Sequence, residues 1–129
     1  MKITLTKPQL RVSQSDKRFR VLISGRRFGK TFLTIIEMMK QASRPNQVIW
    51  YVAPTFKMAK EICWSDLKQM LSKYNWIEDI NETTLTIRIR KTNSIIALKG
   101  AENFDALRGS GINFLVLDEF ADIDKRTWF

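Results

Sequence analysis

Residues 24–31 (SGRRFGKT) have the types and spacing that can hold a phosphate group. In a phosphate-binding loop, glycines let the backbone wrap around the anion, and the following helix directs its N–H groups at it. The usual pattern is G-x-x-x-x-G-K-S/T. Here Ser24 stands at the first glycine position and Gly25 follows one place later, so the loop is a variant of the pattern. The residues predicted to cradle the phosphates are Ser24, Gly25, Arg26, Arg27, Phe28, Gly29, Lys30 and Thr31.

The last two residues of this loop have the chemistry that a nucleoside triphosphate requires. Lys30 should contact the β- and γ-phosphates, and the hydroxyl of Thr31 should bind Mg²⁺. Gly25 and Gly29 permit the backbone to approach the phosphates closely. Because Gly-Lys-Thr is a common tripeptide, this segment alone does not separate a nucleotide-binding loop from a chance match.

A second segment, residues 114–119 (FLVLDE), is an apolar strand pattern that ends in two acids. Such a strand places carboxylates at the carboxyl edge of a parallel sheet, where ligands bind. Asp118 is predicted to hold Mg²⁺ through water, and Glu119 to orient and deprotonate the attacking water. An isolated Asp-Glu pair is more often a solvated acidic loop. Its combination with residues 24–31 favours a P-loop NTPase.

Two arginines are candidates for stabilising the charge that develops on the γ-phosphate during its transfer. Arg26 lies inside the loop and is preferred, whereas Arg27 is expected to face solvent. Arg108 is the second candidate and could act on the nucleotide of a neighbouring subunit. A turn residue with no such role is an equal alternative for Arg108.

The elements that must position these residues alternate between strands and helices. Their expected order is strand 19–24, helix 31–42, strand 47–52, helix 56–74, an antiparallel hairpin of 84–90 with 94–98, and strand 112–117. This order predicts an α/β fold, a P-loop NTPase (ASCE-type) parallel sheet with helical crossovers and an inserted β-hairpin. Since a doubly wound domain normally continues with further strands, residues 1–129 are expected to be one partial, C-terminally incomplete domain.

The composition narrows the classes of function. The chain has 129 residues, of which 44% are hydrophobic, and a formal net charge of +9. The positive charge suggests either nucleic acid or nucleotide phosphates as a partner, although basic domains without such a partner are as common. With one cysteine and no histidine, a disulfide within the chain and Ser-His-Asp catalysis are excluded. Cys63 lies on an apolar helical stripe and is predicted to be a buried structural thiol.

Two further segments matter together with the phosphate-loop segment and the acidic segment, because the four follow one another in a fixed order along the chain. Residues 51–60 (YVAPTFKMAK) follow the second strand. Residues 99–109 (KGAENFDALRG) precede the acidic segment, whose family-like pattern covers residues 114–122 (FLVLDEFAD). Together with residues 24–31, they resemble the ATPase domain of the large terminase subunit of tailed bacteriophages. A generic helicase would match only the first and last segments. The aromatic pair Trp50 and Tyr51 could suggest a base-stacking platform, but packing in the strand core is the preferred interpretation.

The resemblance implies a function and further site residues. It implies that ATP and Mg²⁺ are the cofactors and that hydrolysis drives double-stranded DNA into procapsids. It implies a homo-oligomeric ring, with the portal protein and the small terminase subunit as partners, in the host cytoplasm. Gln9 matches the family's adenine-recognising glutamine, with Gln14 as the alternative, and Arg26 matches its loop arginine.

Two parts of the family pattern are expected to be missing, namely a coupling motif beyond the acidic pair and a C-terminal nuclease domain. No nuclease activity is therefore expected. Two alternatives stay open: a catalytically inactive remnant that only binds nucleotide or DNA, and a fragment of a P-loop helicase.

Overall fold

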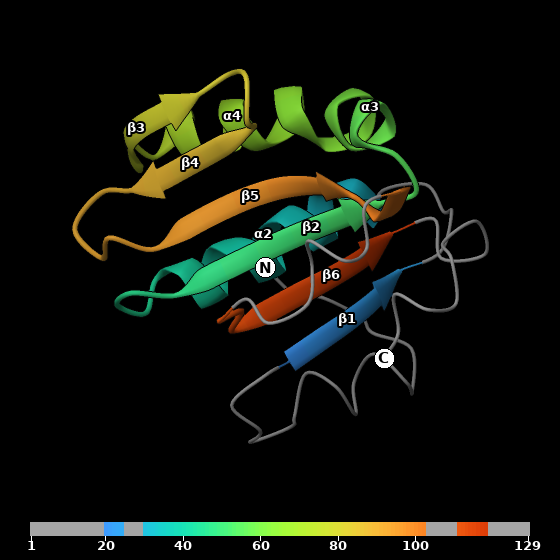
Figure 1. Cartoon of the computed structure of the whole chain (residues 1–129). Helices are drawn as coiled ribbons and strands as arrows, with labels where there is room; N and C mark the ends of the chain where they lie inside the picture. Colours follow the sequence, from blue (N-terminus) through green and yellow to red (C-terminus); the bar gives the residue numbers. More distant parts are fainter. Residues whose placement is uncertain (1–19, 25–29, 103–110, 119–129) are drawn as a thin grey trace.

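A sheet with helices packed against it is the main feature of the computed structural model, which describes residues 20–24, 30–102 and 111–118 (Figure 1). The strands are β1 Arg20–Ser24, β2 Val48–Ala53, β3 Ile77–Asn81, β4 Thr86–Ile89, β5 Ile95–Gly100 and β6 Phe114–Asp118. The helices are α2 Lys30–Ala42, α3 Phe56–Ala59 and α4 Ser65–Lys73, with a π-helical turn, η1 Lys60–Trp64, between the last two. Within this described part of the chain, no helix is long and apolar enough to cross a membrane.

The described strands form a six-stranded sheet in the order β1-β6-β2-β5-β4-β3. The first four of these strands are parallel to one another, and β4 and β3 extend the sheet in antiparallel pairing (Figure 1). The predicted α/β fold with a parallel sheet and helical crossovers is therefore confirmed. β6 lies between β1 and β2, which places the strand that carries Asp118 in the interior of the sheet.

The predicted hairpin needs one correction and one addition. β4 and β5 pair in antiparallel fashion as expected, but β5 is not part of an insertion, because it also pairs with β2 in parallel. The additional strand, β3, was not predicted and pairs with β4 at the edge of the sheet. A register shift between Ile77 and Asp79 interrupts its alternation, so that Ile77 and Ile80 both pack against the core. Because these two isoleucines are three positions apart, the segment lacks the alternation of apolar and polar residues by which a strand is recognised.

The helix predicted over 56–74 is present as α3, η1 and α4, with a wide turn in its middle. The Thr55 side chain caps its start by accepting a hydrogen bond from the Met58 N–H. Its buried stripe, with every member fully inaccessible, consists of Ala59, Cys63, Leu67 and Leu71. A strict spacing of four drifts around an α-helix of 3.6 residues per turn, and the wider π turn reduces that drift. The π turn therefore keeps the stripe against the sheet.

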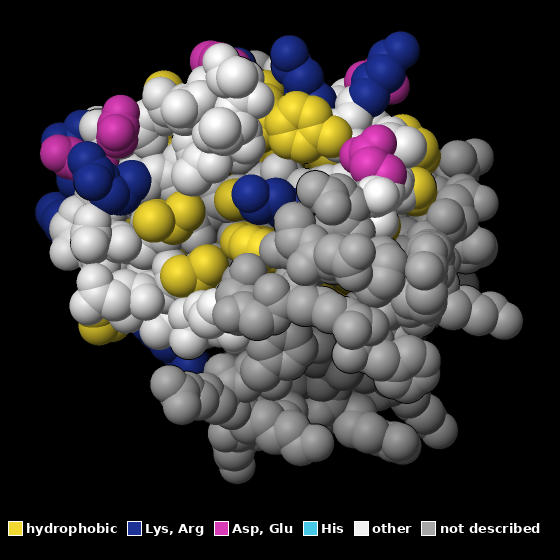
Figure 2. All heavy atoms as spheres, in the orientation of Figure 1, with side chains coloured by type: hydrophobic (Ala, Val, Ile, Leu, Met, Phe, Trp, Pro, Cys, Tyr) yellow, Lys and Arg dark blue, Asp and Glu magenta, His cyan; other side chains and the backbone are white. Residues whose placement is uncertain are grey.

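Two clusters of buried side chains lie on opposite faces of the sheet, as the alternation along β2 and β6 requires. Ile49, Tyr51 and Val116 belong to the larger cluster, which also contains the buried residues of α2 and of the helix from α3 to α4. Both helical crossovers therefore cover the same face, which is turned away from the viewer in Figure 1. Figure 2 shows hydrophobic side chains on the opposite face, beside Lys and Arg side chains. α2 is buried along most of its length as predicted, except that Phe32 and Lys40 are exposed.

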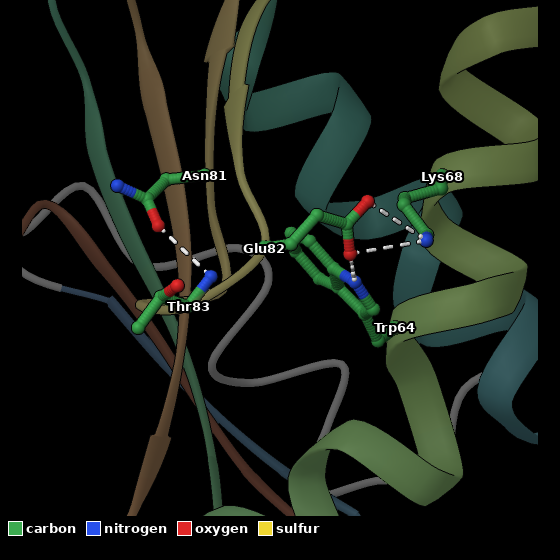
Figure 3. A network of polar contacts seen from close by, with 5 residues as sticks. All are labelled: Trp64, Lys68, Asn81, Glu82 and Thr83. Carbon is green, nitrogen blue, oxygen red and sulfur yellow. Dashed lines mark hydrogen bonds and ion pairs between the residues drawn. The ribbon is translucent and has the colours of Figure 1, made fainter.

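A small polar network ties the turn between β3 and β4 to the helical layer (Figure 3). The Trp64 Nε1–H donates to Glu82 Oε1 at 2.7 Å, and Lys68 Nζ lies 3.1 Å from Glu82 Oε2. The hydrogen bond from Trp64 is the main reason why the pKa of Glu82 lies below its usual range, and the contact with Lys68 lowers this pKa further. The network joins η1 and α4 to the β3–β4 hairpin, which the sequence pattern does not predict.

Gly100, at the end of β5, lies where a side chain has no room. A Cβ at this position would overlap the backbone N of Phe56 and would lie 2.8 Å from the Thr55 carbonyl carbon. We expect Gly100→Ala to lower the free energy of unfolding by about 1–3 kcal/mol, because the start of α3 must shift to make room. Urea denaturation measures this difference. Gly111→Ala is the matched control, since nothing lies within 4 Å of a Cβ added there. Equal stability of the two variants would contradict the prediction.

Candidate functional site

The first residue of the predicted phosphate loop and the predicted metal ligand end neighbouring strands. β1 and β6 are parallel, and Ser24 is in register with Asp118. The chain therefore enters the loop directly beside the strand that carries the acid. The ends of β2 and β5 lie at the same edge of the sheet, with Ala53 in register with Gly100. This is the carboxyl edge, at which open α/β sheets bind their ligands.

The N-terminus of α2 faces this same edge. A short turn connects the C-terminal end of α2 to the start of β2, so the helix runs antiparallel to the strands. Lys30 is its first residue and Thr31, which is half-buried, its second. The first turn contains no acidic residue. The partial positive charge of the helix N-terminus therefore has no carboxylate in its own first turn to neutralise it, which favours an anion such as phosphate.

Asp118 is fully buried at the end of β6. A buried carboxylate is costly unless hydrogen-bond donors compensate for the water it has lost. Tyr51, also fully buried, donates its hydroxyl to Asp118 Oδ2 from the neighbouring strand β2. A hydrogen bond to a charged group contributes roughly 1.5–3 kcal/mol. The two strands thus provide the acid and a donor that fixes its position.

The surroundings of Asp118 are those of the helix-covered face. Alternation along β6 puts Asp118 on the side of Phe114 and Val116, which pack in the larger core cluster. Burial raises the pKa of the Cys63 thiol on η1, and the charge of Asp118 raises it further. Cys63 is thus a buried, unreactive thiol, as predicted, and it packs in the core cluster of the same face.

The donor set suits Mg²⁺ bound together with a nucleotide. Among the residues that the structure describes, no three Cys, Asp or Glu side chains gather as a metal site. Mg²⁺ keeps several waters and is usually held by one or two carboxylates together with substrate phosphates. The single carboxylate of Asp118 and the hydroxyl of Thr31 are ligands of that kind. They fit a metal that arrives with ATP better than a metal caged by protein alone.

The structure places four of the predicted site residues. Ser24, Lys30, Thr31 and Asp118 lie at the carboxyl edge of the sheet or at the helix start that faces it. The predictions that fall outside the described residues are those on Gln9, Gly25, Arg26, Arg27, Phe28, Gly29, Arg108 and Glu119.

The sequence pattern did not identify Tyr51 as a partner of Asp118. Its preferred interpretation, packing of Trp50 and Tyr51 in the strand core, is confirmed because both side chains are buried. The signal that could have found the contact is the hydroxyl itself, since a buried tyrosine O–H usually finds a hydrogen-bond partner. Trp50 lies on the other face, where Lys99 Nζ stands 5.1 Å from its ring centre.

Comparisons with known proteins agree with this fold and identify the family. Residues 21–129 match the family described as "Terminase large subunit, T4likevirus-type, N-terminal". The terminase large subunits of Thermus phage G20c and Thermus virus P23-45 are each 27% identical to this chain over 93% of its length. The chain spans 28% of the length of each of these relatives.

Solved structures of large terminases share the fold. The ATPase domain of the Thermus phage P74-26 large terminase aligns with a TM-score of 0.68 and 23% identity, over 97% of this chain and 57% of that one. The large terminase of another thermophilic bacteriophage, in a complex with ADP, aligns with a TM-score of 0.69 and 21% identity, over 97% of this chain and 34% of that one. The family match covers the phosphate-loop segment and the acidic strand together. The chain belongs to the family of N-terminal regions of T4likevirus-type terminase large subunits.

Proposed function

We propose that this chain binds and hydrolyses ATP with Mg²⁺ as the ATPase segment of a phage DNA-packaging motor. The observation that carries the proposal is the register of Ser24 with Asp118, which brings the start of the phosphate loop beside the acidic strand. The similar large terminase whose structure includes ADP, from a thermophilic bacteriophage, supports a nucleotide as the ligand. Membership of the terminase family supports the packaging role.

Each residue has a distinct role in this proposal. The N-terminus of α2 and Lys30 bind the β- and γ-phosphates, and Thr31 and Asp118 hold the metal. The metal, when bound, neutralises charge on the phosphate oxygens. Glu119 orients the attacking water and accepts its proton. The recognition of adenine by Gln9, with Gln14 as the alternative, is a separate part of the proposal.

In the packaging motor, ATP hydrolysis would move double-stranded DNA into a procapsid in the cytoplasm of the infected host. The partners would be further copies of the large subunit in a ring, the portal protein and the small terminase subunit. The excess of 22 Lys and Arg over 13 acidic residues favours a polyanionic partner such as DNA.

Phosphate release measured with ATP and excess Mg²⁺ tests the function. We expect turnover that EDTA abolishes and that rises when double-stranded DNA and the packaging partners are added. Stimulation by nucleic acid alone, with no response to a procapsid partner, would favour a helicase instead. Binding of ATP without turnover in the complete mixture would contradict the motor and leave a nucleotide-binding module.

A further inference from the structure

Tyr51 brings a polar hydroxyl into the core of the sheet. It lies in the middle of the interior strand β2, it is fully buried, and its ring packs in the larger core cluster. Its hydroxyl donates to the carboxylate of Asp118 on the neighbouring strand β6. For the packing of the ring alone, phenylalanine would fill the same space without a polar atom to satisfy. The hydroxyl therefore calls for an explanation beyond the core.

The position of β6 explains why this contact matters for the site. In the sheet, β6 has β1 on one side and β2 on the other. Ser24 at the end of β1 is in register with Asp118, and Tyr51 reaches Asp118 from β2. Asp118 therefore lies between β1, which leads into the phosphate loop, and β2, in which the segment 51–60 starts. That segment contributes to the resemblance to terminases, but the proposed function gives it no role.

We propose that Tyr51 is a positioning residue for the metal site, which holds the carboxylate of Asp118 in the orientation that accepts the nucleotide-bound Mg²⁺. The proposal rests on the proposed function, because it takes Asp118 as the acid that serves the metal. A carboxylate side chain can rotate about two bonds, and a donor from a rigid neighbouring strand removes much of that freedom. Its two oxygens offer about four acceptor positions, and the bond from Tyr51 uses one of them, on Oδ2.

Removal of the Tyr51 hydroxyl should lower the affinity of the site for Mg²⁺ and leave the affinity for the nucleotide without metal unchanged. Hydrogen bonds to the groups that hold a metal typically change metal affinity by about 10–100-fold when they are removed. Loss of the hydroxyl should therefore weaken the coupling between Mg²⁺ and ATP, while the contacts of the phosphates with α2 and Lys30 persist. A role in packing alone would change stability without changing this coupling.

The test is Tyr51→Phe, which removes the hydroxyl and keeps the ring. The affinity of the chain for a fluorescent ATP analogue is measured in excess Mg²⁺ and again in EDTA, and the ratio of the two affinities gives the coupling. We expect Tyr51→Phe to lower this ratio about 10-fold, with an unchanged affinity in EDTA. The matched control is Tyr74→Phe, since these are the chain's two tyrosines and Tyr74 is an exposed residue after the end of α4.

A third variant, Asp118→Asn, separates failure of this inference from failure of the function. If Asp118→Asn lowers the ratio and Tyr51→Phe does not, the positioning role is wrong and the metal role of Asp118 stands. If Asp118→Asn leaves the ratio unchanged, the metal site itself is wrong, and the proposed function and this inference fail together. If Tyr51→Phe also weakens binding in EDTA as much as in Mg²⁺, or if Tyr74→Phe lowers the ratio equally, the residue acts on the fold in general and the inference is overturned.

Discussion

Replacing Lys30 by alanine should reduce ATP turnover by about 100-fold or more, which is the usual cost of removing one preorganised group that stabilises developing charge. Lys30 begins α2, the helix whose N-terminus faces the edge where Ser24 and Asp118 lie in register. Its ammonium group would be the positive charge that reaches the outer phosphates. Phosphate release in excess MgATP measures the loss.

Lys40→Ala is the matched control, since it removes the same charge from the last turn of the same helix. The Lys40 side chain is largely exposed, and its Nζ lies 3.7 Å from Glu37 Oε1. Because exposed ion pairs contribute little, Lys40→Ala should change the stability little and leave the turnover unchanged. Thermal unfolding of both variants checks that each one is folded. Turnover of Lys30→Ala at the level of the wild type would remove residues 24–31 from the mechanism.

The sequence predicted best the elements whose apolar pattern is clear and which directly adjoin a recognisable loop or acidic residue. β1, α2, β2 and β6 combine uniform apolar character with a loop or acid at a fixed place, and the structure places each within one or two residues of its predicted bounds. Their parallel pairing follows from the helical crossovers. For this reason the sequence alone could bring Ser24 and Asp118 to one edge of the sheet.

The parts that it missed depend on contacts between distant residues. β3 is polar and exposed in part, and the register shift between Ile77 and Asp79 gives its isoleucines a spacing that no strand pattern predicts. The hydrogen bond from Tyr51 to Asp118 joins residues 67 positions apart. Alternation predicts the face on which each side chain lies, but not which hydroxyl meets which acid. Such a contact depends on the order of the strands, which places β6 beside β2.

Removing the arginine that stabilises the transferring phosphoryl group should lower turnover by about 1,000-fold or more. Arg26 and Arg108 are the two candidates, and both lie outside the described residues. We expect Arg26→Ala to cause this loss with a much smaller effect on ATP affinity, because the charge it stabilises develops only in the transition state. Arg108→Ala serves as the comparison. Turnover that falls only for Arg108→Ala would transfer the role to Arg108.

Mixing two inactive variants in the assembled motor distinguishes an arginine that acts within its own subunit from one supplied by a neighbour. A Lys30→Ala subunit has no working nucleotide site but keeps both arginines. If Arg108 acts on the neighbouring site, Lys30→Ala subunits supply it to Arg108→Ala subunits, and the mixture regains turnover. If Arg26 acts on its own nucleotide, a mixture of Arg26→Ala with Lys30→Ala regains none, because every site lacks either the lysine or the arginine. Recovery in that second mixture would contradict a role for Arg26 within its own subunit.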